Sequence, residues 1–148
     1  MKDNNFKKIL LIISMLLFLT AVGNTQTLDT VAKLKTHYQL CLDSGVNFQN
    51  CARTYCMSLY KMVDTAYENL NDALSPNERL ILKNDQAQWL KKRSKFEKEQ
   101  SKEFQENIRS GTWGYEMAGE FFYEHDAEFT RKRIVELIKK REKKAACK

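Results

Sequence analysis

The sequence predicts an all-α protein, an up-down antiparallel bundle of about four helices that follows a cleaved signal peptide. Apolar residues recur at helical spacing over long stretches, and no alternating strand pattern of useful length interrupts them. Glycine and proline are scarce, with five glycines and one proline in 148 residues, and most of them mark three breaks. Because the connections at those breaks are short, successive helices should run antiparallel.

The first 23 residues have the layout of a secretory signal peptide. Three lysines precede an apolar run over residues 9–19, and Ala21 and Gly23 occupy the −3 and −1 positions of a cleavage site. The apolar run is shorter than the roughly 20 residues that a membrane-spanning helix needs. We therefore expect a secreted or periplasmic protein with no stable membrane insertion after cleavage. An uncleaved anchor is the alternative.

The first two expected helices cover about residues 28–43 and 48–74. Gly45, in the sequence LDSGVN, marks the turn between them, because glycine often follows a helix C-terminus. The inward face of the first helix carries Val31, Leu34, Tyr38 and Cys41. The second helix has a strict 4-3 apolar spacing, which is typical of a helix packed lengthwise on a partner. Its stripe consists of Cys56, Tyr60, Val63, Tyr67, Leu70 and Leu74.

The third expected helix covers about residues 76–108, and the fourth begins near Tyr115. Ser75 is a suitable N-cap, Pro76 suits the first helical position, and Glu78 completes a capping box. The stripe of the third helix is Leu82, Gln86, Trp89, Arg93 and Phe96, and its polar second half is expected to be a solvated extension. The fourth helix should turn inward Phe122, His125, Phe129, Ile134, Leu137 and Ile138.

The charge of the chain divides it into an acidic body and a basic end. Residues 131–148 carry nine basic and two acidic side chains, a net of +7, whereas residues 24–130 sum to −3. We therefore expect a signal peptide (1–23), one helical domain (24–138) and a basic tail (139–148) that continues the fourth helix. No aromatic residues interleave with the basic charges, and export removes a genomic target, so no nucleic acid partner is expected. An acidic glycan or an anionic membrane surface suits the tail better.

All four cysteines follow the predicted cleavage site, where an oxidising compartment allows disulfides. Cys41 and Cys56 lie on the inward stripes of two helices that the turn at Gly45 folds together, whereas Cys51 lies more than a quarter turn off that stripe. The expected pair is therefore Cys41–Cys56, with Cys41–Cys51 as the alternative and Cys147 free or linking two chains. The sequence has no C-x-x-C and only two distant histidines, so neither a metal site nor a cofactor is expected.

The sequence carries no clear catalytic constellation. His125 has Asp126 and Glu128 nearby, but it lies between two phenylalanines on the apolar stripe, and no serine motif accompanies it. A packed, hydrogen-bonded histidine is the better interpretation. The glutamates of the third helix are typical of a solvated face, and no cleft-forming loops bring them together as paired carboxylates. We expect no catalytic residues and a protein that is not an enzyme.

Gln86, Trp89 and Arg93 share one face of the third helix, within the sequence DQAQWLKKR. A buried guanidinium needs a partner, because an unpaired charge inside a core is costly. Asp64 of the second helix is the predicted partner, and Glu68 is the second candidate. We interpret Asp64, Gln86, Trp89 and Arg93 as a structural clasp between helices, with a ligand site as the alternative.

The motif residues also resemble a known family. The pattern C-x3-Y-x3-D (Cys56, Tyr60, Asp64) is followed by L-x3-Q-x2-W-x3-R (Leu82, Gln86, Trp89, Arg93) and by T-x2-R-x3-L (Thr130, Arg133, Leu137). In this order and spacing they resemble the LprI-like lysozyme-inhibitor domain of exported bacterial proteins, over roughly residues 41–137. The family is helical and often has two further cysteines, which would form a disulfide between the last two helices. This chain has Glu97 and His125 at those positions, and we expect an ion pair between them in place of the disulfide.

The resemblance implies an exported, non-enzymatic binding protein. Its expected partner is a protein or a cell-envelope component, with lysozyme as one candidate and inhibition of a cell-wall-degrading enzyme as one candidate activity. Lysozymes are commonly strongly basic, so only the acidic body would complement one. The alternatives are a structural or adhesive envelope protein that binds acidic polymers, and an enzyme that acts on glycans.

Overall fold

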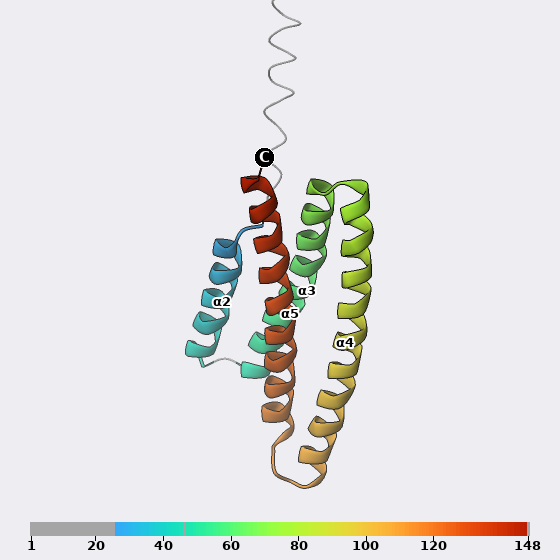
Figure 1. The fold of residues 1–148 in the computed structure, drawn as a ribbon. Helices are drawn as coiled ribbons and strands as arrows, with labels where there is room; N and C mark the ends of the chain where they lie inside the picture. The colour runs from blue at the N-terminus through green and yellow to red at the C-terminus, as the bar shows by residue number, and fades with distance from the viewer. Residues whose placement is uncertain (1–25, 46, 148) are drawn as a thin grey trace, which may run out of the picture.

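The structure, a computed structural model, describes residues 26–45 and 47–147. This part of the chain forms four helices and no strand, which confirms the all-α bundle. The helices are α2 (Leu28–Asp43), α3 (Phe48–Ala73), α4 (Pro76–Arg109) and α5 (Tyr115–Ala146). Each runs antiparallel to the helix before it, as expected (Figure 1). The predicted signal peptide lies outside the described residues.

Local sequence signals set the helix ends. The predicted capping box before α4 is present: the Ser75 N–H donates to the Glu78 carboxylate at 2.9 Å. Gly45 and Gly111 follow the last residues of α2 and α4 with φ angles of 69° and 70°. Residues other than glycine rarely adopt this left-handed backbone conformation, so these two glycines can end the helices and turn the chain.

The centre of the bundle is the pair α3 and α5, which run parallel and make the most extensive helix–helix contact. Six of the residues that α3 buries form a row spaced alternately four and three apart: Ala52, Cys56, Leu59, Val63, Ala66 and Leu70. In α5, Ala127, Thr130, Ile134 and Leu137 follow the same spacing, and each has no exposed surface. The small members of these rows let the two backbones approach closely, as in a coiled-coil seam.

The stripe predicted on α3 was only partly right. Cys56, Val63 and Leu70 are buried as expected, but Tyr60 and Tyr67 are only partly buried. Helix α3 has partners on two sides, so one face carries the small residues of the seam and the adjacent face carries the tyrosines. The hydroxyphenyl ring of Tyr60 lies under the guanidinium of Arg93 in α4, at 3.9 Å from ring centroid to Cζ.

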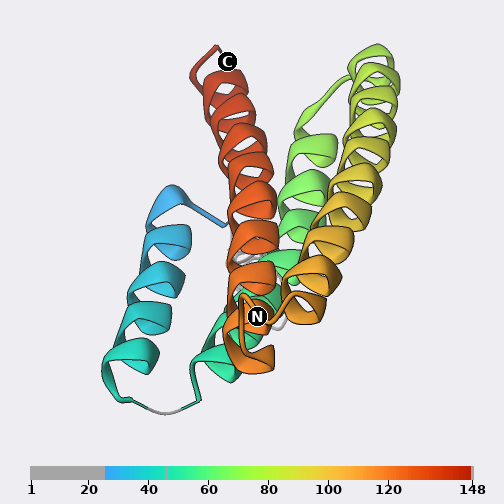
Figure 2. The same cartoon turned by 90° about the horizontal axis from the view of Figure 1, so that it is seen from below.

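The outer helices α2 and α4 lie on opposite sides of the central pair (Figure 2). Helix α2 contributes the buried Val31 and a stacked ring pair, Tyr38 on Tyr55 of α3 at 4.7 Å. The second half of α4 was expected to be a solvated extension; it is largely exposed, but it does not project from the bundle. Phe104 packs edge-on against Phe122 of α5 at 6.1 Å, so aromatic contacts hold this half of α4 against the start of α5.

Helix α5 continues through the basic segment to Ala146, as the sequence predicts. Near its end the Arg141 guanidinium donates to the backbone carbonyl of Gln26 at 2.9 Å, which ties α5 to the residues before α2. Helix α5 thus contacts all three other described helices. None of the described helices is long and apolar enough to cross a membrane.

The disulfide joins Cys41 to Cys51, so the predicted Cys41–Cys56 pair is wrong and the alternative pairing is the one found. The Cα atoms of Cys41 and Cys51 are 5.8 Å apart, within the range that a disulfide requires. Cys56 lies five residues after Cys51, about 140° further round the helix. It therefore faces α5, whereas Cys51 faces the end of α2. The prediction failed because the inward stripe of α3 was assumed to face α2.

We predict that replacing both Cys41 and Cys51 by serine lowers the free energy of unfolding by somewhat less than about 3 kcal/mol. That is the chain-entropy value for a 15-residue loop, and this loop is shorter. Urea unfolding of the two proteins measures the difference, and peptide mapping without reductant should recover the Cys41–Cys51 crosslink. In the folded protein the exposed Cys147 should react with an alkylating agent, and the buried Cys56 should react only after unfolding. Recovery of a Cys41–Cys56 peptide would contradict this pairing.

Candidate functional site

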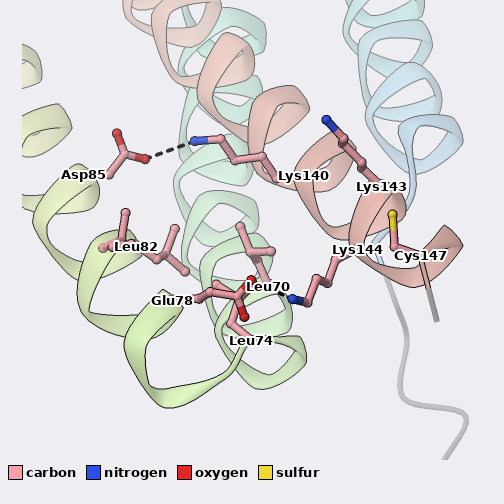
Figure 3. A pocket seen from close by; sticks show the side chains of 10 residues that line it. Leu70, Leu74, Glu78, Leu82, Asp85, Lys140, Lys143, Lys144 and Cys147 are labelled. Carbon is pink, nitrogen blue, oxygen red and sulfur yellow. Dashed lines mark hydrogen bonds and ion pairs between the residues drawn. The ribbon is translucent and has the colours of Figure 1, made fainter.

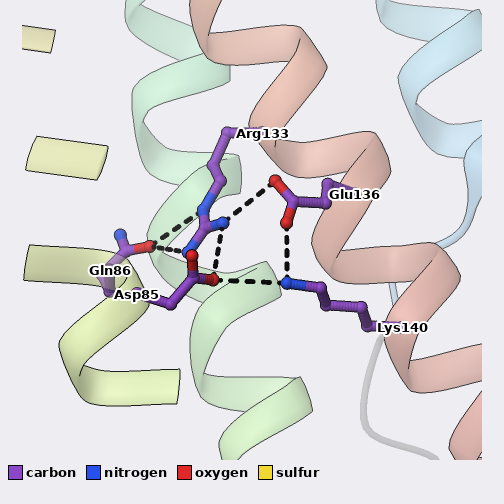
Figure 4. A network of polar contacts seen from close by, with 5 residues as sticks. All are labelled: Asp85, Gln86, Arg133, Glu136 and Lys140. Carbon is purple, nitrogen blue, oxygen red and sulfur yellow. Dashed lines mark hydrogen bonds and ion pairs between the residues drawn. The ribbon is translucent and has the colours of Figure 1, made fainter. Parts of the chain in front are cut away.

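The most elaborate polar site joins α4 to α5 and centres on Arg133, whose side chain is 1% exposed. Its guanidinium donates two hydrogen bonds to the Gln86 side-chain oxygen, at 3.1 and 2.8 Å (Figure 4). Its Nη1 lies 3.0 Å from carboxylates on both helices, those of Asp85 and Glu136. Lys140 closes the network with contacts of 3.3 Å to Asp85 and 2.7 Å to Glu136.

The two carboxylates of this network are held in their ionised form. Burial alone would raise the pKa of Asp85, but hydrogen bonds from Arg133 and Lys140 outweigh it and lower that pKa. The same balance lowers the pKa of Glu136, where Lys140 and Arg133 are the donors. Because every charged group has an opposite charge in reach, the buried guanidinium is compensated.

A second polar layer lies two turns of α4 away, seven residues after Gln86, and centres on Arg93 and Asp126. Arg93 Nε lies 2.9 Å from the Glu97 carboxylate and 3.9 Å from that of Asp126, at angles that make ion pairs but no hydrogen bond. Asp126 is 2% exposed, and burial raises the pKa of its carboxyl group. Its other oxygen accepts a hydrogen bond from the Cys56 thiol at 3.6 Å. Burial, followed by the neighbouring Asp126 charge, raises the pKa of that thiol.

An aromatic layer separates the two arginines. Trp89 stacks on Phe129 of α5 with ring centroids 6.0 Å apart, and Phe96 stacks on the same ring at 4.7 Å. The guanidinium carbons of Arg93 and Arg133 lie 5.8 and 5.9 Å from the Trp89 ring. The tryptophan ring thus has a guanidinium from each of two helices within about 6 Å. Each such cation–π contact contributes about 0.5–1 kcal/mol or more to the stability of the fold.

The clasp predicted around Asp64 of α3 is not formed; Gln86, Trp89 and Arg93 of α4 meet side chains of α5 instead. Asp64 and Glu68 are both exposed, and neither pairs with Arg93 among the described residues. Gln86 does not support Arg93 either; it binds Arg133. The assignment failed because it paired α4 with its neighbour in sequence, whereas α4 packs chiefly on α5.

Sequence reasoning missed Asp126 and Arg133, which are the buried charges of α5. One signal was available: they are seven residues apart, so both lie on one helical face, together with the intervening Phe129. Arg133 was also part of the T-x2-R-x3-L motif, but it was given no role. Buried charges spaced at seven on one helix indicate a partner helix with matching polar residues.

His125 takes part in a structural contact. Its Nδ1 lies 2.9 Å from the Gln100 side-chain oxygen, and its ring packs on Phe121 at 3.8 Å. The ion pair expected between Glu97 and His125 is not formed, since Glu97 pairs with Arg93. Across residues 26–45 and 47–147, no three His, Cys, Asp or Glu side chains are grouped so that they could hold a metal ion.

Several hollows lie between α4 and α5 in the part of the chain that the structure describes, and two of them are the largest there. One, of about 350 Å³, is lined in part by Tyr60, Glu97 and Asp126. The larger one, a groove of about 590 Å³, lies between the start of α4 and the end of α5 (Figure 3). Trp89 lines neither of them, which favours its interpretation as part of a clasp.

Charge is distributed unequally along α5. Residues 115–130 contain five acidic side chains and no lysine or arginine, whereas residues 131–147 contain eight basic and two acidic ones. Acidic residues near a helix N-terminus and basic ones near its C-terminus also suit the helix dipole. Because α5 runs the length of the bundle, the molecule has an acidic end at the α4–α5 turn and a basic end at the C-terminus.

Comparison with known proteins identifies no matching family, no similar curated protein and no matching solved structure.

We predict that Arg133→Ala lowers the free energy of unfolding by about 3–5 kcal/mol, the cost of removing one partner from a buried ionic network. The matched control is Arg131→Ala, which removes a partly exposed ion pair with Glu128 within α5 and should cost at most about 1 kcal/mol. Urea unfolding followed by circular dichroism measures both. Equal losses in the two variants would show that the Arg133 network is not a stabilising clasp.

The raised pKa of Asp126 makes a prediction about pH. The folded protein holds this proton to a higher pH than the unfolded chain, where the pKa is about 3.9. The contribution of the Asp126 carboxyl group to the free energy of unfolding is therefore fully present below the unfolded-state pKa. It is lost as the pH rises through the higher pKa of the folded state. An asparagine does not titrate, so Asp126→Asn does not lose stability in this way. The Tm of Asp126→Asn minus the Tm of the parent should therefore increase as the pH is raised from about 4 to about 7.

Thermal melts across that pH range test the expectation. Asp64→Asn, at an exposed position of α3, is the control for losing one carboxylate. A Tm difference between Asp126→Asn and the parent that does not change with pH would show that the Asp126 carboxylate is as easily ionised in the folded protein as in the unfolded chain.

Proposed function

We propose that this chain is an exported, non-enzymatic binding protein of the LprI-like kind, whose acidic end binds a basic cell-wall-degrading enzyme such as lysozyme. The observation that carries the proposal is the charge gradient of α5. Its first half carries five acidic residues and no lysine or arginine; Asp126 is buried, but Glu120, Glu124 and Glu128 are partly exposed at the end that would complement a strongly basic enzyme. Such complementarity accelerates encounter and orients the partner.

The groups at the acidic end are placed for contact with a partner. Glu120 and Glu124 are partly exposed on α5, and Glu103 is exposed on the adjacent part of α4. Burial, followed by the neighbouring Glu124 charge, raises the pKa of Glu120, so a cation brought close to this pair would relieve their repulsion. Glu124 also accepts a hydrogen bond from the Tyr38 hydroxyl, which fixes its position against α2.

The position of the motif residues also supports the proposal. Gln86, Trp89 and Arg93 on α4 and Arg133 on α5 lie at one helix–helix interface, and Thr130 lies in the α5 row that faces α3. The motif that resembles the LprI-like domain thus contributes side chains to the scaffold of this bundle. A rigid scaffold suits a protein whose function is to present a surface.

We predict that the purified mature protein inhibits lysozyme and that Glu103→Lys combined with Glu120→Lys weakens the inhibition at least about tenfold, because like charges across an interface are repulsive. Each of the two single variants is compared with Glu142→Lys, the same charge reversal at an exposed position of the basic end, which should inhibit as the parent does. Cell-wall turbidity assays at increasing molar ratios measure the inhibition, and circular dichroism checks that the variants fold.

Lysozyme activity that stays unchanged at a large molar excess of the protein would remove the inhibitor role. Equal weakening by Glu142→Lys would show that inhibition follows net charge and not the acidic end. Turnover of peptidoglycan fragments that disappears in a His125→Ala variant would replace the proposal with a glycan-acting enzyme.

A further inference from the structure

The groove at the basic end exists because the apolar stripe of α5 stops before the helix does. After Ile138, the described part of α5 has no apolar side chain larger than alanine up to Ala146. Large apolar side chains do line this end on the other helices, namely Leu70 of α3, Leu74 directly after α3, and Ile81 and Leu82 of α4. Leu70 and Leu82 still belong to the core that includes Ile138, but beyond Ile138 α5 offers no large apolar side chain, and the space between the helices is left open.

The apolar lining is graded from the base of the groove to its mouth. Leu70 and Leu82 are 2% and 4% exposed and form the base. Leu74 is partly exposed, and Ile81 is 70% exposed at the side. A volume of about 590 Å³ falls in the range of small-molecule sites, which are mostly apolar with a few polar groups that orient the ligand.

The mouth of the groove is cationic. Three lysines of α5 and two carboxylates of α4 line it, which gives a net charge of +1. Two of the lysines make ion pairs across the groove: Lys144 lies 2.6 Å from Glu78, and Lys140 lies 3.3 Å from Asp85 (Figure 3). Hydrogen bonds from Lys144 and then Ser75 lower the pKa of Glu78 to about 2, so this pair stays ionised. Lys143 is exposed and pairs with no carboxylate among the described residues.

We propose that this groove binds a long-chain fatty acid, with the acyl chain along the leucines and the carboxylate against Lys143. The apolar base fits the chain, the stems of the lysines extend the apolar walls, and their ammonium groups lie at the mouth. The rest of the C-terminal half of α5 adds to the attraction, because residues 131–147 carry a net charge of +6. This site is independent of the acidic end that is proposed to bind a basic enzyme.

The same charges argue against a second copy of this chain as the occupant. A symmetric contact through the exposed Ile81 would bring two sets of groove lysines together. Like charges across an interface are repulsive, whereas an anionic amphiphile meets complementary charge and apolar surface at once.

Isothermal titration of the folded protein with dodecanoate, below its critical micelle concentration, tests the proposal. We expect saturable binding at one site, much weaker binding of dodecyltrimethylammonium, and at least about tenfold weaker dodecanoate binding in Lys143→Glu and in Ile81→Asp. Both changes are at exposed positions. Their matched controls are Lys139→Glu, at an exposed position one turn earlier in α5, and Leu90→Asp, at a half-exposed position of α4; neither residue lines the groove.

Absence of binding below the micelle concentration would overturn the proposal, and so would equal binding of the cationic amphiphile. Binding to anionic phospholipid vesicles without binding of monomeric dodecanoate would assign this end to a membrane surface instead. A dimer in sedimentation analysis that Ile81→Asp dissociates would assign the groove to a second copy. None of these results bears on lysozyme inhibition, which is measured separately and depends on the opposite end of the bundle.

Discussion

Helices α3 and α5 bury small residues against each other along most of their length, and both outer helices take their positions from this pair. Ala52 and Ala66 on α3 meet a row on α5 that includes Ala127 and Thr130, all of them almost without exposed surface. A larger side chain in either row would separate the backbones and strain the packing. Helix α2 is then fastened by the disulfide and by Tyr38, and α4 is fastened through its contact with α5.

The contact between α4 and α5 follows a different rule, in which polar and aromatic layers alternate. Gln86, Arg93 and Gln100 recur at intervals of seven on α4, and each meets a polar side chain of α5. Phe129 fills the layer between the first two. Apolar residues alone would pack in several registers, whereas buried charges that must each find a partner favour one register. The clasp therefore specifies the alignment of the two helices more than it adds stability.

Much of the fold could be predicted from sequence because its signals are local. Ser75 and Glu78 mark a helix start, Gly45 marks a helix end, and the apolar spacing gives the helix lengths to within one or two residues. The partners of Arg93 and of Cys41 could not be predicted, because they depend on which helices touch. Helices α3 and α5 run parallel and are separated in sequence by the whole of α4. No local pattern indicates that these two helices pack together more extensively than helices that follow each other in the chain.

The distance in sequence between α3 and α5 also decides when the core can form. A chain that ends before Thr130 lacks Ile134, Leu137 and Ile138, which are among the most buried side chains of the molecule. During synthesis α2, α3 and α4 would therefore emerge with their apolar rows uncovered, and the core could assemble only once the last helix is complete. Contacts between residues so far apart in sequence form slowly, because the chain between α3 and α5 must lose conformational entropy before they are made. The nascent protein thus has an interval in which a chaperone can hold it before the core closes.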